Sequence, residues 1–183
     1  MPLLFQHKIG LEDRPIPIDG IRTLLQEARS EYPWPRRTCT TYAPPMRTVF
    51  VFPTGERAET VASLDRHLPQ QRKPWVLAGG LYIDIDDEQT GYLFSDWDPD
   101  DVAAVEAALG HQPTWAVQID ISARIDGTAE VHQLVALLLE HGGVATDDYS
   151  DRPWTLQEIE SGAEFDGLRF FEFRTYHELY HQR

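Results

Sequence analysis

The pattern His-Glu-Leu-Tyr-His at residues 177–181 is the stretch of this chain whose residue types and spacing most directly suggest chemistry. Two histidines separated by three residues share one face of a helix and can hold zinc, and the glutamate can act as a general base toward a metal-bound water. A zinc-dependent hydrolase would therefore use His177 and His181 as metal ligands and Glu178 as the catalytic base.

The sequence around this motif argues against a zinc site. Residues 168–176, LRFFEFRTY, alternate imperfectly and predict a final strand just before the motif, not an amphipathic helix. Only Gln182 and Arg183 follow His181, so the usual downstream third ligand is missing, and the last turn of a helix frays. We therefore expect a polar tail with no catalytic residue and no cofactor, and keep the zinc hydrolase as the alternative.

A first group of carboxylates lies near the middle of the chain, where residues 75–95 predict a β-hairpin with its turn at DDEQTG, residues 86–91. The group places four acidic side chains at or next to this turn: Asp84, Asp86, Asp87 and Glu88. Turn chemistry accounts for some of them, but four carboxylates exceed what a turn requires. The group therefore predicts an exposed acidic surface for contact with a partner.

A second acidic stretch, TDDYSDRPW, covers residues 146–154 directly after a predicted short strand. It adds five predicted partner-binding residues, with the carboxylates supplying charge and the two rings supplying anchors: Asp147, Asp148, Tyr149, Asp151 and Trp154. The adjacent pair of aspartates could also serve as an acid–base or metal pair. Turn formation is the favoured interpretation of that pair.

The overall charge narrows the classes of partner. The formal net charge is −14, which repels the phosphate backbones of nucleic acids and attracts a basic protein. Solubility or adaptation to salt explains the same acidity equally well. The chain is 42% hydrophobic and 25% charged, as in folded globular proteins. No apolar run approaches the about 18 residues of a membrane span, and no signal peptide is recognisable, so a cytoplasmic protein is expected.

The order of predicted elements indicates the fold. Strands are expected at residues 48–52, 115–121 and 144–146, besides the hairpin and the final strand. Helices are expected from Asp98 to Gly110 and from Thr128 to Gly142, with a further short one near residues 154–159. This order predicts an α+β fold with a mixed, mostly antiparallel sheet and helices mainly on one face. Residues 1–183 are taken as one domain, with residues 75–147 as an alternative structural sub-unit.

These features favour a protein-binding function. We expect an acidic module that occupies a basic partner such as a toxin, in the manner of immunity or inhibitor proteins. The chain contains no phosphate-binding loop, no dinucleotide fingerprint and no serine-nucleophile elbow. A small-molecule binder remains a further alternative, with Gly79-Gly80 close to a pocket formed by Trp34, Tyr42 and Trp75.

Overall fold

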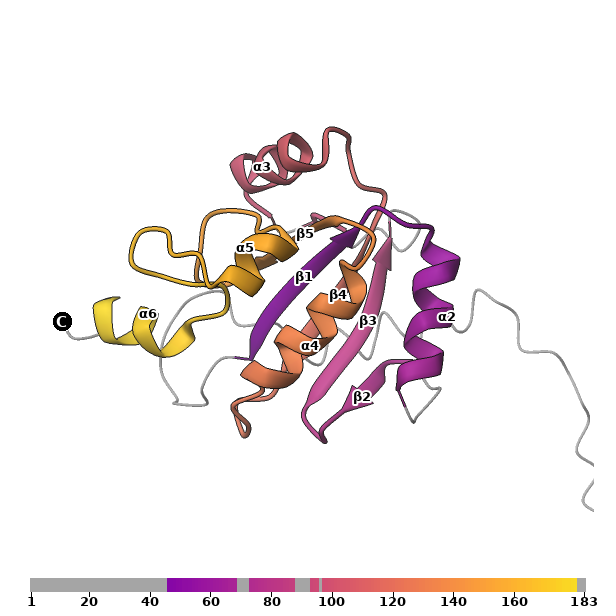
Figure 1. The fold of residues 1–183 in the computed structure, drawn as a ribbon, viewed down its shortest axis with the longest axis horizontal. Helices are drawn as coiled ribbons and strands as arrows, with labels where there is room; N and C mark the ends of the chain where they lie inside the picture. Colours follow the sequence, from indigo (N-terminus) through magenta and orange to yellow (C-terminus); the bar gives the residue numbers. More distant parts are fainter. Residues whose placement is uncertain (1–45, 69–72, 88–92, 96, 181–183) are drawn as a thin grey trace, which may run out of the picture. The chain divides into compact units, whose positions relative to one another are not determined.

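The computed structural model describes residues 46–68, 73–87, 93–95 and 97–180, which lie within one compact unit of the chain. Its centre is an antiparallel sheet of five strands in the order β2-β3-β4-β1-β5 (Figure 1). The strands are β1 (Arg47–Pro53), β2 (Trp75–Leu77), β3 (Leu81–Asp87), β4 (Trp115–Ile121) and β5 (Gly143–Asp147). The predicted α+β class is confirmed.

Helices connect and cover these strands. They are α2 (Arg57–His67), α3 (Pro99–Leu109), α4 (Thr128–Leu138), α5 (Leu156–Ser161) and α6 (Phe173–Tyr180). Helix α3 has the ends that the sequence predicts: the Asp98 side chain accepts a hydrogen bond from the backbone of Asp100, and Gly110 closes the helix with a φ of 77°. No helix of the described residues is both long and apolar enough to cross a membrane.

One face of the sheet forms the main hydrophobic core. Side chains alternate between the two faces of a strand, so every second residue of the central strands points to this core. Helix α4 runs across this face (Figure 1) and contributes four buried side chains, Val131, Leu134, Val135 and Leu138. The sheet residues beneath are apolar and almost inaccessible to solvent: Val49, Val51, Leu81, Ile83, Ile85, Val117, Ile119 and Ile121.

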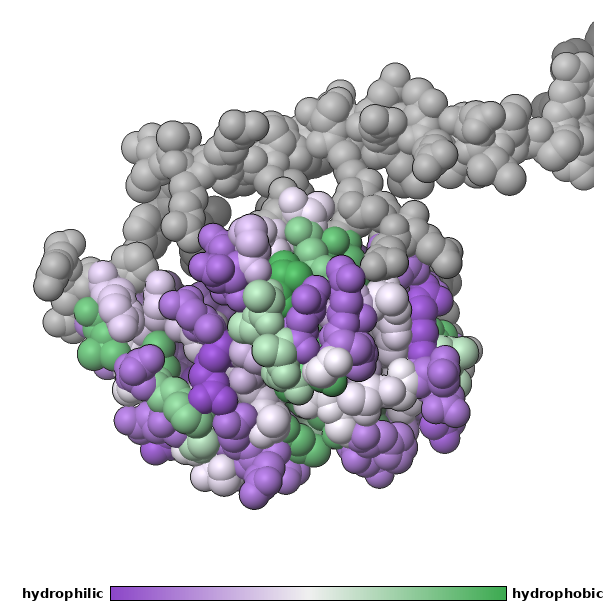
Figure 2. Space-filling view, turned by 90° about the horizontal axis from the view of Figure 1, so that it is seen from above, coloured by the Kyte–Doolittle hydropathy of each residue, from purple (hydrophilic) through white to green (hydrophobic). Residues whose placement is uncertain are grey.

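The opposite face is covered at one end. Helix α3 supplies Val105 to a second, smaller core that includes Phe52, Ala116 and Val144, and the rings of Phe94 and Trp97 pack beside it. The remaining part of this face carries polar side chains. On the molecular surface seen in Figure 2, hydrophilic and hydrophobic side chains are interspersed.

A hairpin forms within residues 75–87, so it is not the predicted one, whose turn was expected at residues 86–91. Strands β2 and β3 pair directly, and the connection is Ala78–Gly80 instead of residues 86–91. The Gly80 carbonyl accepts a hydrogen bond from the backbone of Ser122, and a Cβ at Gly80 would lie 2.6 Å from Ile125 Cδ1. The two glycines thus form a tight turn beside β4, and residues 93–95 belong to no strand.

The predicted final strand at residues 168–176 is wrong. Phe170 and Phe171 are both buried, which the alternation of a strand on a one-sided sheet does not allow. Phe171 has a φ of 57°, and helix α6 begins two residues later at Phe173. The aromatic residues reach the core from an irregular segment, so high aromatic content did not indicate a strand here. Trp34 and Tyr42, which the small-molecule alternative places in a pocket, lie outside the described residues.

Candidate functional site

A row of polar side chains crosses the part of the sheet that none of the described helices covers. Tyr82 of β3, Asp120 of β4 and Thr48 of β1 are direct neighbours in the sheet register, and Asp84 lies opposite Gln118 in the next row. Strand alternation places these side chains on the face opposite the main core. We call the following set the acidic sheet face: Thr48, Tyr82, Asp84, Asp86, Gln118, Asp120 and Asp148.

Hydrogen bonds organise the centre of the acidic sheet face around Thr48. The Thr48 hydroxyl donates to Asp120 Oδ1 over 3.0 Å, and the Thr48 backbone N–H donates to Asp148 Oδ2 over 2.6 Å. Gln118 Nε2 lies 3.0 Å from each carboxylate oxygen of Asp120. The two carboxylates are therefore held on either side of one threonine, although they lie far apart in the sequence.

Loss of hydration, and then the charges of neighbouring carboxylates, raise the pKa of two carboxyls of this face. Loss of hydration raises the pKa of Asp120, and the nearby charge of Asp84 raises it further. The pKa of Asp148 is raised to about 6, first because surrounding protein displaces water and then because Asp147 and Asp120 are close. Among the described arginines and lysines, none forms an ion pair with Asp84, Asp120 or Asp148. A cation would therefore be stabilised at this face.

The first predicted acidic group lies on a strand instead of a turn. Asp84, Asp86 and Asp87 belong to β3, and Glu88 lies outside the described residues. Asp84 is exposed on the acidic sheet face, and Asp86 shares its strand parity. Asp87 has the opposite strand parity to Asp84 and Asp86, and it forms an ion pair of 3.1 Å with Arg57 of α2.

Asp147 and Asp148 have separate roles. Asp147 Oδ1 accepts hydrogen bonds from the backbone N–H groups of Tyr149 and Ser150 and from the Ser150 hydroxyl, and its Oδ2 accepts one from the Phe171 N–H. Asp147 is thus a turn former that also anchors the segment before α6. Asp148 is exposed and faces Thr48, so it is the member of the pair that a partner can reach.

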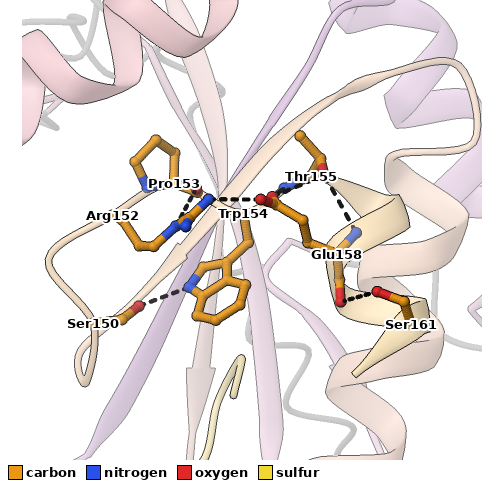
Figure 3. A network of polar contacts seen from close by, with 7 residues as sticks. All are labelled: Ser150, Arg152, Pro153, Trp154, Thr155, Glu158 and Ser161. Carbon is orange, nitrogen blue, oxygen red and sulfur yellow. Dashed lines mark hydrogen bonds and ion pairs between the residues drawn. The ribbon is translucent and has the colours of Figure 1, made fainter. Parts of the chain in front are cut away.

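The two predicted aromatic anchors are part of the interior. Trp154 is completely buried, and its Nε1 donates to the Ser150 hydroxyl over 2.7 Å (Figure 3). Tyr149 is 9% exposed, and burial raises the pKa of its hydroxyl. Their rings stabilise the fold and are not available as surface anchors, whereas Asp151 is exposed.

Figure 3 shows the polar contacts of the segment that follows Asp151. The Thr155 hydroxyl and the Glu158 carboxylate form a reciprocal capping box at the start of α5. Arg152 donates to Glu158 Oε1 over 2.7 Å. Its guanidinium carbon lies 3.6 Å from the centre of the Phe165 ring. These contacts fix the loop that carries the buried indole of Trp154.

Residues 177–180 of the tail motif lie on helix α6. His177 and Glu178 are exposed residues of α6, and His181 lies outside the described residues. The helical backbone removes one of the sequence arguments against a zinc site. No group of three or more potential metal ligands occurs among the residues that the structure describes. The zinc-dependent hydrolase therefore stays a prediction.

Three central residues of the acidic sheet face were missed in the sequence. Thr48, Gln118 and Asp120 had been read only as alternating positions of predicted strands. The sequence nevertheless contains a signal for a polar sheet face. Gln118 and Asp120 are two residues apart in β4, so both point to the same face of the sheet, and both are polar. A strand buried on both faces would carry apolar residues there.

We expect the contribution of Asp148 to the free energy of unfolding to fall as pH rises from about 4 to about 7. A carboxyl whose pKa is about 6 in the folded state and 3.8 ordinarily binds its proton more tightly when folded. The stabilisation that this tighter proton binding contributes is complete below the ordinary pKa of 3.8, and it is lost as pH rises through the folded-state pKa of about 6. Because Asp148 is partly hydrated, we expect about 1 kcal/mol from this group.

Urea denaturation at several pH values measures this effect. Asp148→Asn keeps an acceptor for the Thr48 N–H but removes the titratable carboxyl. The free energy of unfolding of the variant, minus that of the wild type, should therefore change by about 1 kcal/mol between about pH 4 and about pH 7. Carboxyls with a lowered pKa, such as Asp126 and Glu158, are present in both proteins, so their contributions to the free energy of unfolding cancel when the two proteins are compared. An unchanged difference across the range would contradict the assignment.

Comparison of the chain with protein-family models, with curated protein sequences and with solved structures found no match.

Proposed function

We propose that this protein is an acidic binding module of the cytoplasm that occupies a basic protein partner, as inhibitors of basic toxins do. The observation that carries the proposal is the arrangement of Asp84, Asp120 and Asp148 on the acidic sheet face. Loss of hydration and, after it, nearby negative charges raise the pKa of Asp120 and Asp148, and no described arginine or lysine pairs with any of the three carboxylates. A cationic side chain from a partner would relieve this repulsion.

The chemistry of the face favours arginine as the contacting residue. A guanidinium is planar and presents several N–H donors, so it can bridge two carboxylates or bind one with two hydrogen bonds. Tyr82 is 42% exposed beside Asp120 and offers an aromatic surface on which such a group can stack. The net charge of −14 would accelerate the encounter with a basic protein.

Binding of a defined cationic probe tests this function. We expect a fluorescein-labelled octa-arginine peptide to bind the protein, with an affinity that falls from about 50 to about 500 mM sodium chloride. The double variant Asp84→Asn, Asp120→Asn should weaken binding about tenfold, because it removes two charge-assisted contacts. Fluorescence anisotropy measures the dissociation constants.

A matched variant separates this face from the general acidity of the surface. Glu140 follows α4 and Glu160 lies in α5, both are exposed, and both helices cover the opposite face of the sheet. Glu140→Gln, Glu160→Gln removes the same charge, and we expect it to weaken binding less than about twofold. Equal losses in the two double variants would show that the peptide responds only to net charge, and the proposal would fail.

A further inference from the structure

Helix α6 is attached to the domain without a buried side chain of its own. None of its eight residues is buried, whereas α4 contributes four buried side chains to the main core. Leu179 and Tyr180, at the end of α6, are more than half exposed, and the ion pair between Arg174 and Asp126 is exposed to solvent as well. Elements that bury so little apolar surface open locally at a much lower free energy than that of unfolding the whole domain.

Contacts near the start of α6 hold this helix against the end of the sheet. The Phe171 N–H donates to Asp147 Oδ2 over 2.6 Å. The guanidinium carbon of Arg47 lies 4.3 Å from the centre of the Phe173 ring. The ring of Tyr149 packs beside the rings of Phe171 and Phe173, and it also contacts α6. On the side of the sheet, the partners of α6 and of the residues before it thus lie at the start of β1 and at or just after the end of β5.

Two features of this attached, or closed, arrangement are unfavourable. Arg47 is 7% exposed, and its Nη1 has no hydrogen-bond partner among the described residues, although its Nη2 donates to two backbone carbonyls. A buried donor without an acceptor is costly. Phe171 has a φ of 57°, which a bulky residue seldom adopts, so backbone strain is stored just before α6. Movement of the Phe173 ring away from Arg47 would admit water to the guanidinium, and rotation at Phe171 would release the strain.

The same strand ends also carry part of the acidic sheet face. On β1, Arg47 points to the side of the main core, whereas the next residue, Thr48, points to the acidic sheet face. At the end of β5, Asp147 accepts a hydrogen bond from the Phe171 N–H. The next residue, Asp148, accepts one from the Thr48 N–H and belongs to the acidic sheet face. On both strands, therefore, one peptide unit separates a contact of the segment around α6 from a contact of the acidic sheet face.

We propose that residues 172–180 form a strap that opens and closes about Phe171, and that a cation bound to the acidic sheet face favours the closed state. The inference rests on the proposed function, because the basic partner supplies this cation. A cation held by the Asp148 carboxylate fixes the end of β5, and with it the Asp147 carboxylate that holds Phe171 in its strained conformation. Such coupling is reciprocal, so an open strap must weaken binding of the cation by the same factor by which the cation favours closure.

Hydrogen exchange of single amides, followed by NMR, tests the strap without any ligand. We expect the amides of residues 176–180 to open as one unit and to be at least about 100-fold less protected than the amide of Val135 in α4. Arg174→Gln removes the ion pair with Asp126, so the common exchange rate of residues 176–180 should rise about threefold. Protection equal to that of Val135, or protection that declines steadily towards residue 180 as in a fraying helix end, would overturn the strap.

Exchange in the presence of the fluorescein-labelled octa-arginine peptide tests the coupling. At saturation, the peptide should slow the exchange of residues 176–180 about fivefold, whereas exchange in α2 should change less than about 1.5-fold. Unchanged exchange of α6 in a protein that binds the peptide would overturn the coupling and leave the proposed function intact. Absence of peptide binding would overturn both the proposed function and the coupling, and exchange without the peptide would still decide whether the strap exists.

Substitutions in the strap test the reciprocal effect. The double variant Phe173→Ala, Arg174→Gln removes the ring beside Arg47 and the ion pair with Asp126, and it leaves the acidic sheet face unchanged. We expect it to weaken octa-arginine binding about threefold, although loss of a positive charge would by itself strengthen binding of a cationic peptide. If the double variant does not fold, Arg174→Gln alone should weaken binding in the same direction. Arg66→Gln removes the same charge from an exposed position on α2 and should not weaken binding. Binding by the strap variant as tight as binding by Arg66→Gln would refute the coupling.

Discussion

Replacing Asp147 with alanine is expected to lower the free energy of unfolding by about 3 kcal/mol. The Asp147 carboxylate accepts four hydrogen bonds, from two backbone N–H groups and the hydroxyl in residues 149–150 and from the N–H of Phe171. Alanine would leave these donors without their acceptor in a partly buried loop. Chemical denaturation monitored by tryptophan fluorescence measures the loss.

Asp148→Ala is the matched control for this prediction. It deletes the neighbouring carboxylate, but it leaves only the Thr48 N–H without an acceptor. It also removes a charge that is destabilised first by loss of hydration and then by nearby carboxylates. We expect its free energy of unfolding to stay within about 1 kcal/mol of the wild type. A loss in Asp147→Ala no larger than that in Asp148→Ala would contradict the structural role of Asp147.

A separate aromatic position should show an effect of similar size. Trp154→Ala is expected to cost about 4 kcal/mol, because truncation of a fully buried tryptophan leaves a large cavity. The indole packs against Phe165 and Phe170, with ring centres 5.2 and 6.2 Å away. The backbone pairing of Trp154 with Ala145 does not depend on the side chain and should persist. Thermal and chemical denaturation both report this loss.

Two further substitutions show whether the loss arises from packing. Trp154→Phe keeps most of the buried ring but loses the hydrogen bond to Ser150, so we expect a cost of about 1.5 kcal/mol. Tyr82→Ala removes a ring that is 42% exposed on the acidic sheet face, and we expect less than about 1 kcal/mol. If Trp154→Ala were as mild as Tyr82→Ala, Trp154 would be a surface residue and the sequence prediction of a partner contact would be supported.

These two positions show what the residue types of the acidic stretch predict and what they do not. The acidic stretch at residues 146–154 was recognised from its residue types, but residue type does not say which way a side chain points. Asp147 points to backbone donors and Trp154 to the core, while Asp148 faces Thr48. A difference of one position along the chain separates a structural carboxylate from an accessible one.

The sequence by itself determined the local elements. The start of α3 at Asp98 and its end at Gly110, the alternation of β4, and the glycines after α4 follow from interactions within a few residues. Such contacts depend on neighbours in the chain, so the residue pattern contains their cause. The same holds for the α+β class, which follows from the order of these elements.

Only the tertiary structure decided the acidic sheet face, the contacts of the strap and the end of the fold. Thr48 bonds to Asp148 across 100 positions, and Arg47 bonds to Ile125 across 78. Residues 168–176 have the composition of a strand, yet hydrogen bonding to Asp147 and burial of consecutive phenylalanines impose an irregular segment and a helix. Strand order and loop anchoring bring these groups together, because free energy gained from contacts between distant residues exceeds local preference.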